Sequence, residues 1–251
     1  MRTMFRFCRW GLVFVGILGI SGRPTPVQAE TIQALSGDSF TRQDGAVARL
    51  VNVRAPLEEA PAAAARQALG TTLREATVTD IATDGLDRYG RQRVLHVALT
   101  PKASGATTLH EALLKVGAVF LDPETDSPLP ESWRQAEREA RAAGRGLWQV
   151  PAYADQAPDD VGARVGHEAF VRGRVLHVSR VKNIVYMNFG PDWRTDFTIR
   201  IPARLLRGLR QQGLDPTTLE GQEVRVRGLV QRSGGPAIEL VNAGQLERGT
   251  P

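Results

Sequence analysis

Cysteine is almost absent from this 251-residue sequence. The single example, Cys8, precedes an apolar run at residues 10–20, so it lies too early to be a lipid-attachment site at the end of that run. Disulfide bonds therefore cannot stabilise the rest of the chain, and its hydrophobic cores must do so. The length leaves room for one large domain or two small ones.

The sequence also has no comfortable membrane span at its start. The apolar run covers about 11 residues, whereas a transmembrane helix takes roughly 20. Arginines precede the run, and Val27-Gln28-Ala29 has the small-x-small pattern of a cleavage site before Glu30. We therefore expect residues 1–29 to be a signal peptide. The mature protein would then be exported to the periplasm or outside the cell, with no membrane segment. An uncleaved membrane anchor is the alternative.

A strong excess of positive charge is missing once this leader is set aside. The formal charge of +5 includes four leader arginines, so the mature chain carries +1. Residues 30–166 carry 15 basic and 19 acidic residues, whereas residues 167–251 carry 13 basic and 8 acidic ones. Proteins that bind nucleic acid usually show a clustered basic footprint. Only the second segment has even a mild one.

Turn signals divide the first half of the mature chain into short strands. Gly37-Asp38 and Asp44-Gly45 are typical of hairpin turns, and Pro56 ends the strand that begins at residue 46. The expected strands cover residues 31–36, 40–42, 46–53, 77–82, 94–99 and 118–121.

Helices are threaded between and after these strands. Residues 58–73 are rich in alanine, and Thr107 or Thr108 begins a second helix that extends to residue 116. A third helix starts at Pro130 and carries an apolar stripe. We expect an OB-like five-stranded barrel with helices packed outside it. The aromatic positions are expected to divide as follows: His110 on a helix surface, and Trp133 and Trp148 in a core or a domain seam.

A second β-rich unit follows a segment that is typical of a linker. Residues 149–166 contain two prolines and little periodicity. The pattern beyond them predicts a second OB-like barrel over residues 167–248, so the whole mature chain is expected to be mostly β with some α (α+β). Its expected elements are strands at residues 170–181, 184–189, 197–201, 223–230 and 237–241, and a helix at residues 202–212.

An ordered set of short motifs in residues 31–148 resembles the staphylococcal nuclease-like (thermonuclease) family. No single motif is decisive, but their order, ending in Gly-Leu-Trp after an Ala-Arg helix, is specific. The motifs are Ser36-Gly37-Asp38-Ser39-Phe40, Ala48-Arg49-Leu50, Pro56, Asp87-Arg88-Tyr89-Gly90-Arg91, Leu109-His110-Glu111-Ala112-Leu113-Leu114, Glu137-Arg138-Glu139-Ala140-Arg141 and Gly146-Leu147-Trp148.

This resemblance implies an OB barrel that carries calcium-dependent phosphodiesterase chemistry. In the family two arginines bind the scissile phosphate, and these match Arg49 and Arg91. Asp38 matches a metal aspartate. Three acids of the family pattern are replaced, by Ser36, Arg54 and Leu57. The calcium site is therefore incomplete, and phosphodiester hydrolysis is doubtful even though both arginines are present.

The altered positions leave three alternatives for the site. Glu58 or Glu59 could serve as the catalytic base if the turn slips by one residue, although acids are favoured at a helix start in any case. Arg54 could instead replace the charge of the metal, which would give a phosphate-binding clamp of Arg49, Arg54 and Arg91. Arg91 could also be a purely structural partner of Asp87.

The second unit resembles an OB-like extension found on some exported bacterial thermonuclease-like domains. Its aromatic residues could stack on nucleic-acid bases beside a basic surface. The simpler interpretation is that the aromatic residues fill a small barrel and the arginines keep it soluble. The residues concerned are Tyr186, Phe189, Trp193, Arg172, Arg174, Arg225 and Arg227.

Three function classes follow from these patterns. The first is an active calcium-dependent nuclease, with Glu58 as base. The second is a catalytically degenerate nuclease fold that binds DNA, RNA or another polyanion through its arginine pair. The third is an envelope interaction module with a protein partner. The missing acids at positions 54 and 57 favour the second class.

Overall fold

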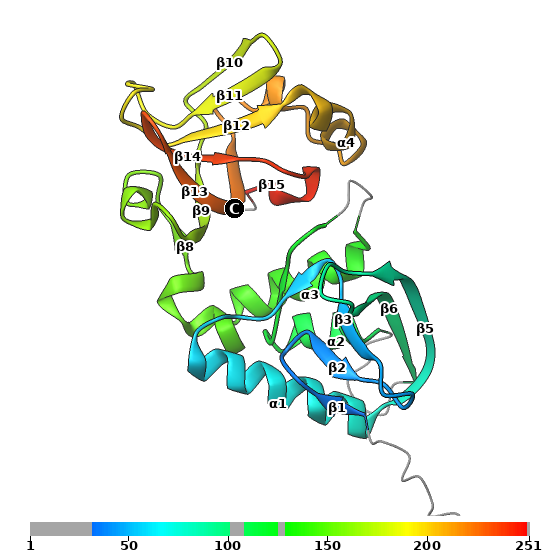
Figure 1. Ribbon diagram of the computed structural model, residues 1–251. Helices are drawn as coiled ribbons and strands as arrows, with labels where there is room; N and C mark the ends of the chain where they lie inside the picture. Colours follow the sequence, from blue (N-terminus) through cyan, green and yellow to red (C-terminus); the bar gives the residue numbers. More distant parts are fainter. Residues whose placement is uncertain (1–31, 101–107, 125–128, 250–251) are drawn as a thin grey trace, which may run out of the picture.

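The computed structural model describes residues 32–100, 108–124 and 129–249. It shows two β-rich units, and the expected mostly-β α+β class is confirmed (Figure 1). The predicted signal peptide lies outside the described residues. No helix within those ranges combines the length and the apolar character needed to cross a membrane.

The first unit is built on a curled five-stranded sheet with the order β1-β2-β3-β6-β5. Neighbouring strands are antiparallel except β3 and β6, which pair in parallel, and β4 pairs separately with β7. The strands are β1 (Gln33–Ala34), β2 (Ser39–Thr41), β3 (Val47–Leu50), β4 (Val53–Arg54), β5 (Thr77–Leu86), β6 (Gln92–Thr100) and β7 (Phe120–Leu121).

Three helices cover the core of this unit: α1 (Glu59–Glu75), α2 (Leu109–Lys115) and α3 (Glu131–Ala142). The hydroxyl of Thr108 accepts a hydrogen bond from the backbone N–H of Glu111 at 3.2 Å, so the expected cap of α2 is confirmed at this threonine. The other expected cap, Thr107, lies outside the described residues. Ala48 and Leu50 of β3 and Leu69 of α1 are buried in the shared core.

The Gly-Leu-Trp motif closes the first unit by a close approach of two backbones. Gly146 has a φ of 55° and Gly117 a φ of 69°, which is the left-handed region that favours glycine. The N–H of Leu147 donates to the carbonyl of Gly117 at 2.9 Å. A Cβ added at Gly146 would overlap that carbonyl group. The motif is therefore explained by packing alone.

The second unit is a larger curled sheet with the order β10-β11-β12-β14-β13-β9-β8, and β15 also pairs with β13. The first expected strand is divided at Val175-Leu176, because its two halves pair with different partners, β9 with β13 and β10 with β11. The elements are β8 (Asp155–Gln156), β9 (Glu168–Arg174), β10 (His177–Val181), β11 (Ile184–Asn188), β12 (Thr198–Pro202), α4 (Leu206–Gln211), β13 (Glu223–Ser233), β14 (Gly235–Glu239) and β15 (Leu246–Arg248).

The segment expected to be a linker is packed against both units. Residues 149–166 form short 3-10 turns and β8, which joins the edge of the second sheet beside β9. Tyr153 and Val161 in this segment are buried. The domain bounds remain a prediction, but residues 149–166 are part of the contact between the two units.

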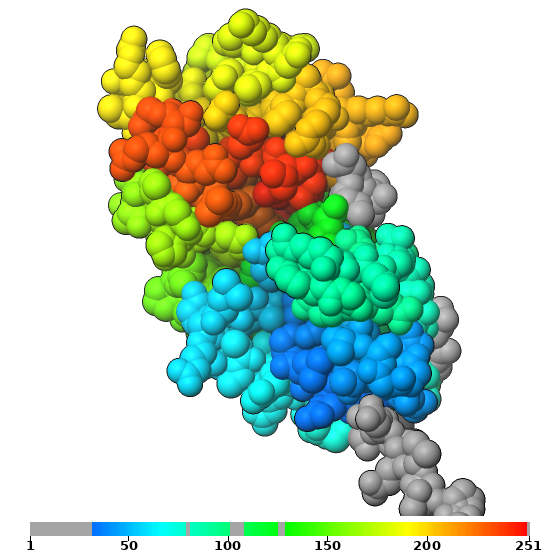
Figure 2. All heavy atoms as spheres, in the orientation of Figure 1, coloured from blue at the N-terminus to red at the C-terminus, as the bar shows by residue number. Residues whose placement is uncertain are grey.

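The two units are in contact (Figure 2). The residues at this seam are aromatic and charged. Phe170 of β9 contacts Phe120 and Trp148 edge-on, with ring centroids 5.5 and 5.4 Å apart, so Trp148 is a seam aromatic as expected. Arg227 of β13 donates to both carboxylate oxygens of Glu137 on α3, at 3.0 and 3.1 Å. Both side chains of this pair are almost completely buried.

Two of the four arginines that were expected on a basic surface of the second unit, Arg225 and Arg227, are thus buried. Arg225 donates to Asp155 of β8 at 2.9 Å, and Arg227 also pairs with Glu247 of β15. The expectation that they back a nucleic-acid surface, or keep a barrel soluble, is wrong. Apolar and basic residues alternate along β13, so they lie on opposite faces, but the basic face is covered by the first unit and by β8.

The expectation that His110 lies on a helix surface is also wrong. Its ring is fully buried and stacks on Trp133, with centroids 4.2 Å apart and planes 6° apart. Its Nε2 lies 3.1 Å from the carbonyl oxygen of Val51. The reason is that α2 packs against α1, α3 and β6 at once, so little of its surface faces water.

Replacing Gly146 with alanine should be much more destabilising than replacing Gly144. Both glycines have nearly the same φ, 55° and 57°, so both substitutions carry similar backbone strain of about 1–2 kcal/mol. Nothing lies near an added Cβ at Gly144, whereas Gly146 would collide with Gly117. We expect Gly146→Ala to cost about 1–3 kcal/mol more, measured by urea unfolding. Equal losses for the two variants would contradict this packing argument.

The buried histidine should make stability depend on pH. Burial, with a smaller contribution from the charge of His96, lowers the pKa of His110 from 6.5 to about 3. Between about pH 3 and 6.5 the unfolded chain binds a proton that the folded chain does not, so stability rises with pH, by at most ~1.4 kcal/mol per pH unit. The His110→Gln variant should lack this contribution.

The measurement is the difference in the free energy of unfolding between wild type and His110→Gln as a function of pH. Other titrating groups are common to both proteins and cancel in this difference. We expect the difference to change steadily on the acid side of pH 6.5 and to be constant above pH 7. A difference that does not depend on pH would show that the folded protein accepts the proton.

Candidate functional site

Arg49 lies on the face of β3 opposite the core, where the strand alternation places it. In the registers of β2–β3 and β3–β6 it is flanked by Ser39 and Arg93, so Arg49 and Arg93 are neighbours on one face. Glu124 joins them, with Oε1 bound to Arg49 Nη2 and Oε2 3.1 Å from Arg93 Nη1. A carboxylate therefore already occupies one edge of the expected phosphate-binding arginine.

The electrostatics of Arg49 show which groups surround it. Partial burial opposes its charge, but hydrogen bonding and attraction from Glu124, followed by the charges of Asp38 and Asp87, outweigh burial and raise the pKa of Arg49. Asp38 and Asp87 are therefore close enough to act on this guanidinium. Asp87 also pairs with the second expected arginine, Arg91.

Arg91 closes the turn between β5 and β6. Asp87 accepts hydrogen bonds from the backbone N–H groups of Tyr89 and Arg91 at 2.9 Å, and its Oδ2 lies 2.8 Å from Arg91 Nε. Slight desolvation opposes ionisation of Asp87, but these hydrogen bonds lower its pKa overall. The structural pairing of Arg91 with Asp87 is confirmed. Among the described residues Nη1 and Nη2 of Arg91 make no hydrogen bond, and the side chain is 31% exposed.

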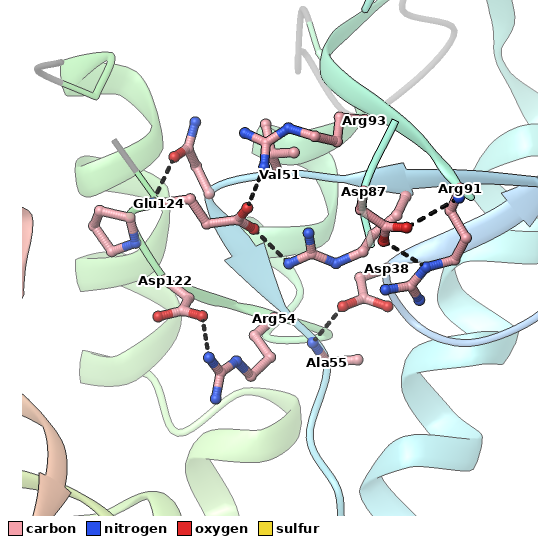
Figure 3. A network of polar contacts seen from close by, with 12 residues as sticks. Asp38, Val51, Arg54, Ala55, Asp87, Arg91, Arg93, Asp122 and Glu124 are labelled. Carbon is pink, nitrogen blue, oxygen red and sulfur yellow. Dashed lines mark hydrogen bonds and ion pairs between the residues drawn. The ribbon is translucent and has the colours of Figure 1, made fainter. Parts of the chain in front are cut away.

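Asp38 stands beside this turn. Its Oδ1 accepts from the hydroxyl of Ser36 at 2.7 Å, and its Oδ2 lies 3.4 Å from the backbone N–H of Ala55. Figure 3 shows Asp38, Asp87 and Arg91 together, whereas Arg54 points away from them toward Asp122. The structure thus gathers Arg49, Arg91 and Asp38 at one place.

Arg54 belongs to the seam between the units. It lies 2.5 Å from Asp122 and also pairs with Glu168 of the second unit. Burial opposes its charge, but attraction from Asp122 and Glu168 raises the pKa of Arg54. The three-arginine clamp expected from the sequence is therefore not assembled in this geometry. Position 54 corresponds to a metal aspartate in the family that the sequence resembles, but here Arg54 connects the two units.

Glu58 also turns toward the seam. The hydroxyl of Tyr153 donates to its carboxylate, and the same hydroxyl oxygen accepts from the backbone N–H of Leu57 at 3.1 Å. Burial and the neighbouring Glu58 together raise the pKa of Tyr153. The Leu57 side chain is 85% exposed and has no acid or base function. The structure does not bring Glu58 to the arginine pair.

A cleft of about 300 Å³ opens at this part of the seam, apart from Arg49 and Arg91. It lies between the start of α1 and the strand β9. Its lining includes Arg54, Leu57, Glu58, Tyr153, Glu168 and Phe170.

The residues around Arg49 and Arg91 do not fit a calcium ion. Calcium takes six to eight oxygen ligands, most of them from carboxylates and carbonyls. Asp87 and Glu124 are each bound to arginine, and the remaining carboxylate, Asp38, is held by Ser36. In the part of the chain that the structure describes, no three His, Cys, Asp or Glu residues are grouped as metal ligands.

Comparison with known proteins gives no family for this chain. No family model matches it, and no curated protein matches it significantly. Its function must be argued from the side chains themselves.

Two residues of the site, Arg93 and Glu124, were not among those expected from the sequence. Arg93 could have been found, because it lies two residues after Arg91, at the start of the strand that follows the turn. Glu124 could not, because it lies 75 residues from Arg49 and follows no motif. Both change the interpretation, since Arg93 adds a second positive charge beside Arg49 on the neighbouring strand, and Glu124 pairs with both arginines.

Proposed function

We propose that the first unit is an OB-type barrel of the staphylococcal nuclease-like kind, followed by a second OB-like barrel, in an exported protein. The curled five-stranded sheet with its outer helices, and the ordered motifs that run from Ser36 to Trp148, support this assignment. The seven-strand path of the second sheet, with α4 between β12 and β13, supports the second barrel.

The function that we infer is binding of phosphate groups of DNA, RNA or another polyanion without metal-dependent hydrolysis. One observation carries it: Arg49 and Arg91 meet around Asp38 and Asp87, while Arg54 and Leu57 stand where the resembling family places acids. Each guanidinium is a planar fork of N–H donors that can bind two oxygens of a phosphate at once. A hydrolytic reaction would need a positioned base, and Glu58 is engaged by Tyr153.

A non-enzymatic module that binds a protein partner is the second candidate. It is favoured by the pairing of Arg49, Arg54 and Arg91 with carboxylates, which lowers the positive potential that would attract a polyanion. Leu57, exposed beside the seam cleft, would suit such a partner.

Replacing either arginine of the pair should weaken binding of single-stranded DNA and RNA by the purified protein. Arg49→Ala and Arg91→Ala should each lose roughly tenfold or more in affinity, because each removes charge-assisted hydrogen bonds worth about 1.5–3 kcal/mol. Arg138→Ala, which removes an exposed arginine of α3 paired with Glu131, is the matched control and should bind normally. Fluorescence anisotropy at fixed ionic strength measures all four proteins.

Calcium and a chelator separate the alternatives in the same assay. We expect binding to be unchanged by EDTA and the oligonucleotides to remain intact. Cleavage that requires calcium and is abolished by Arg91→Ala would establish an active nuclease instead. If neither nucleic acid binds under any of these conditions, the phosphate-binding function is wrong and the protein-partner module takes its place.

A further inference from the structure

Glu124 occupies the position that an anionic ligand of Arg49 would take. One carboxylate oxygen binds Arg49 and the other lies 3.1 Å from Arg93. Its side chain is 20% exposed, so the pair is partly shielded from solvent and is stronger than a surface ion pair. Any anion that binds Arg49 along this edge must first displace Glu124.

The backbone around Glu124 is fixed within the first unit. Its N–H donates to the side-chain oxygen of Asn52 at 3.0 Å, and the N–H of Asp122 donates to the carbonyl of Asn52 at 2.9 Å. Asn52 has a φ of 64°, a left-handed conformation that asparagine tolerates. This single residue thus aligns the segment from both sides of Pro123.

The second unit holds the same segment from the other side. Asn242 donates to the carbonyl oxygen of Pro123, and Arg227 donates to that of Leu121 at 2.5 Å. Gly244 packs against the proline ring so closely that an added Cβ would lie 2.5 Å from Pro123 Cγ. Asn242 is itself buried and fixed by Gln245. The second unit therefore helps to fix the backbone that leads to Glu124.

We propose that Glu124 is the specificity-determining residue of the phosphate site. It is an internal competitor that the second unit holds against Arg49. The site therefore selects dianionic terminal phosphates over the phosphodiesters within a strand. This inference rests on the proposed phosphate-binding function. An internal phosphodiester carries one negative charge, so exchanging it for the carboxylate gains little Coulomb energy. A terminal phosphomonoester carries close to two charges above its second pKa of about 6, so it gains more on displacing the carboxylate.

The test compares two single-stranded DNA oligonucleotides of one sequence, one with a 5′-phosphate and one with a 5′-hydroxyl. Their affinities are measured by fluorescence anisotropy at fixed ionic strength, with inorganic phosphate as a competitor. The wild-type protein should prefer the phosphorylated strand by about tenfold, since one additional charge acts on the arginine pair. Inorganic phosphate should displace both strands.

Glu124→Gln should bind both strands more tightly, with the larger gain for the 5′-hydroxyl strand, so that the preference falls to about twofold or less. Asn242→Ala leaves Glu124 in place but releases Pro123, and it should shift the preference in the same direction by a smaller amount. Glu131→Gln, which neutralises an exposed glutamate of α3 that pairs with Arg138, is the matched control and should keep the wild-type preference.

The outcomes distinguish this inference from the function on which it rests. If wild type and Glu124→Gln bind the two strands with the same ratio of affinities, Glu124 does not determine specificity, although the phosphate-binding function stands. If neither protein binds either strand or inorganic phosphate, the proposed function itself is wrong. Thermal melting checks that the variants fold; should Glu124→Gln not fold, an unchanged preference in Asn242→Ala overturns the inference.

Discussion

A buried charge that must be neutralised is the constraint on which the arrangement of this protein depends. Arg227 of β13 places a guanidinium against the first unit, where Glu137 of α3 and, from the second unit, Glu247 of β15 neutralise it. Burial alone would oppose its charge, but the two carboxylates outweigh that cost and raise the pKa of Arg227. A buried ion pair tolerates little displacement, so it fixes α3 and β13 relative to each other.

The site around Arg49 is connected to the Arg227–Glu137 pair through a short backbone segment. Arg227 also holds the carbonyl of Leu121, and the chain continues through Pro123 to Glu124, which meets Arg49. The contact between the units and the occupancy of the arginine site are therefore parts of one continuous network. Arg54, which stands in place of one of the acids of the expected metal site, belongs to the same network because it pairs with Glu168 across the seam.

Local features of the fold could be predicted from the sequence, and contacts between distant segments could not. The cap at Thr108, the helix α1 and the alternation of β13 follow from spacing and residue type, which act over a few residues. The burial of Arg227 depends on what covers the second face of β13, and periodicity does not reveal that. The pairing of Arg91 with Asp87 could be read from one short motif, whereas Glu124 lies 75 residues from Arg49 and belongs to no motif.

The burial of Glu137 has a consequence for how such a chain can change in evolution. Its side chain is 1% exposed, and its counter-charges are Arg141 on its own helix and Arg227 from the second unit. Deleting the gene segment for the second unit would remove one counter-charge and the protein surface that covers this carboxylate. The first unit alone would keep Glu137 on α3, with Arg141 but without Arg227 as a counter-charge. We therefore expect the two halves to have been passed on as a pair rather than exchanged as separate modules.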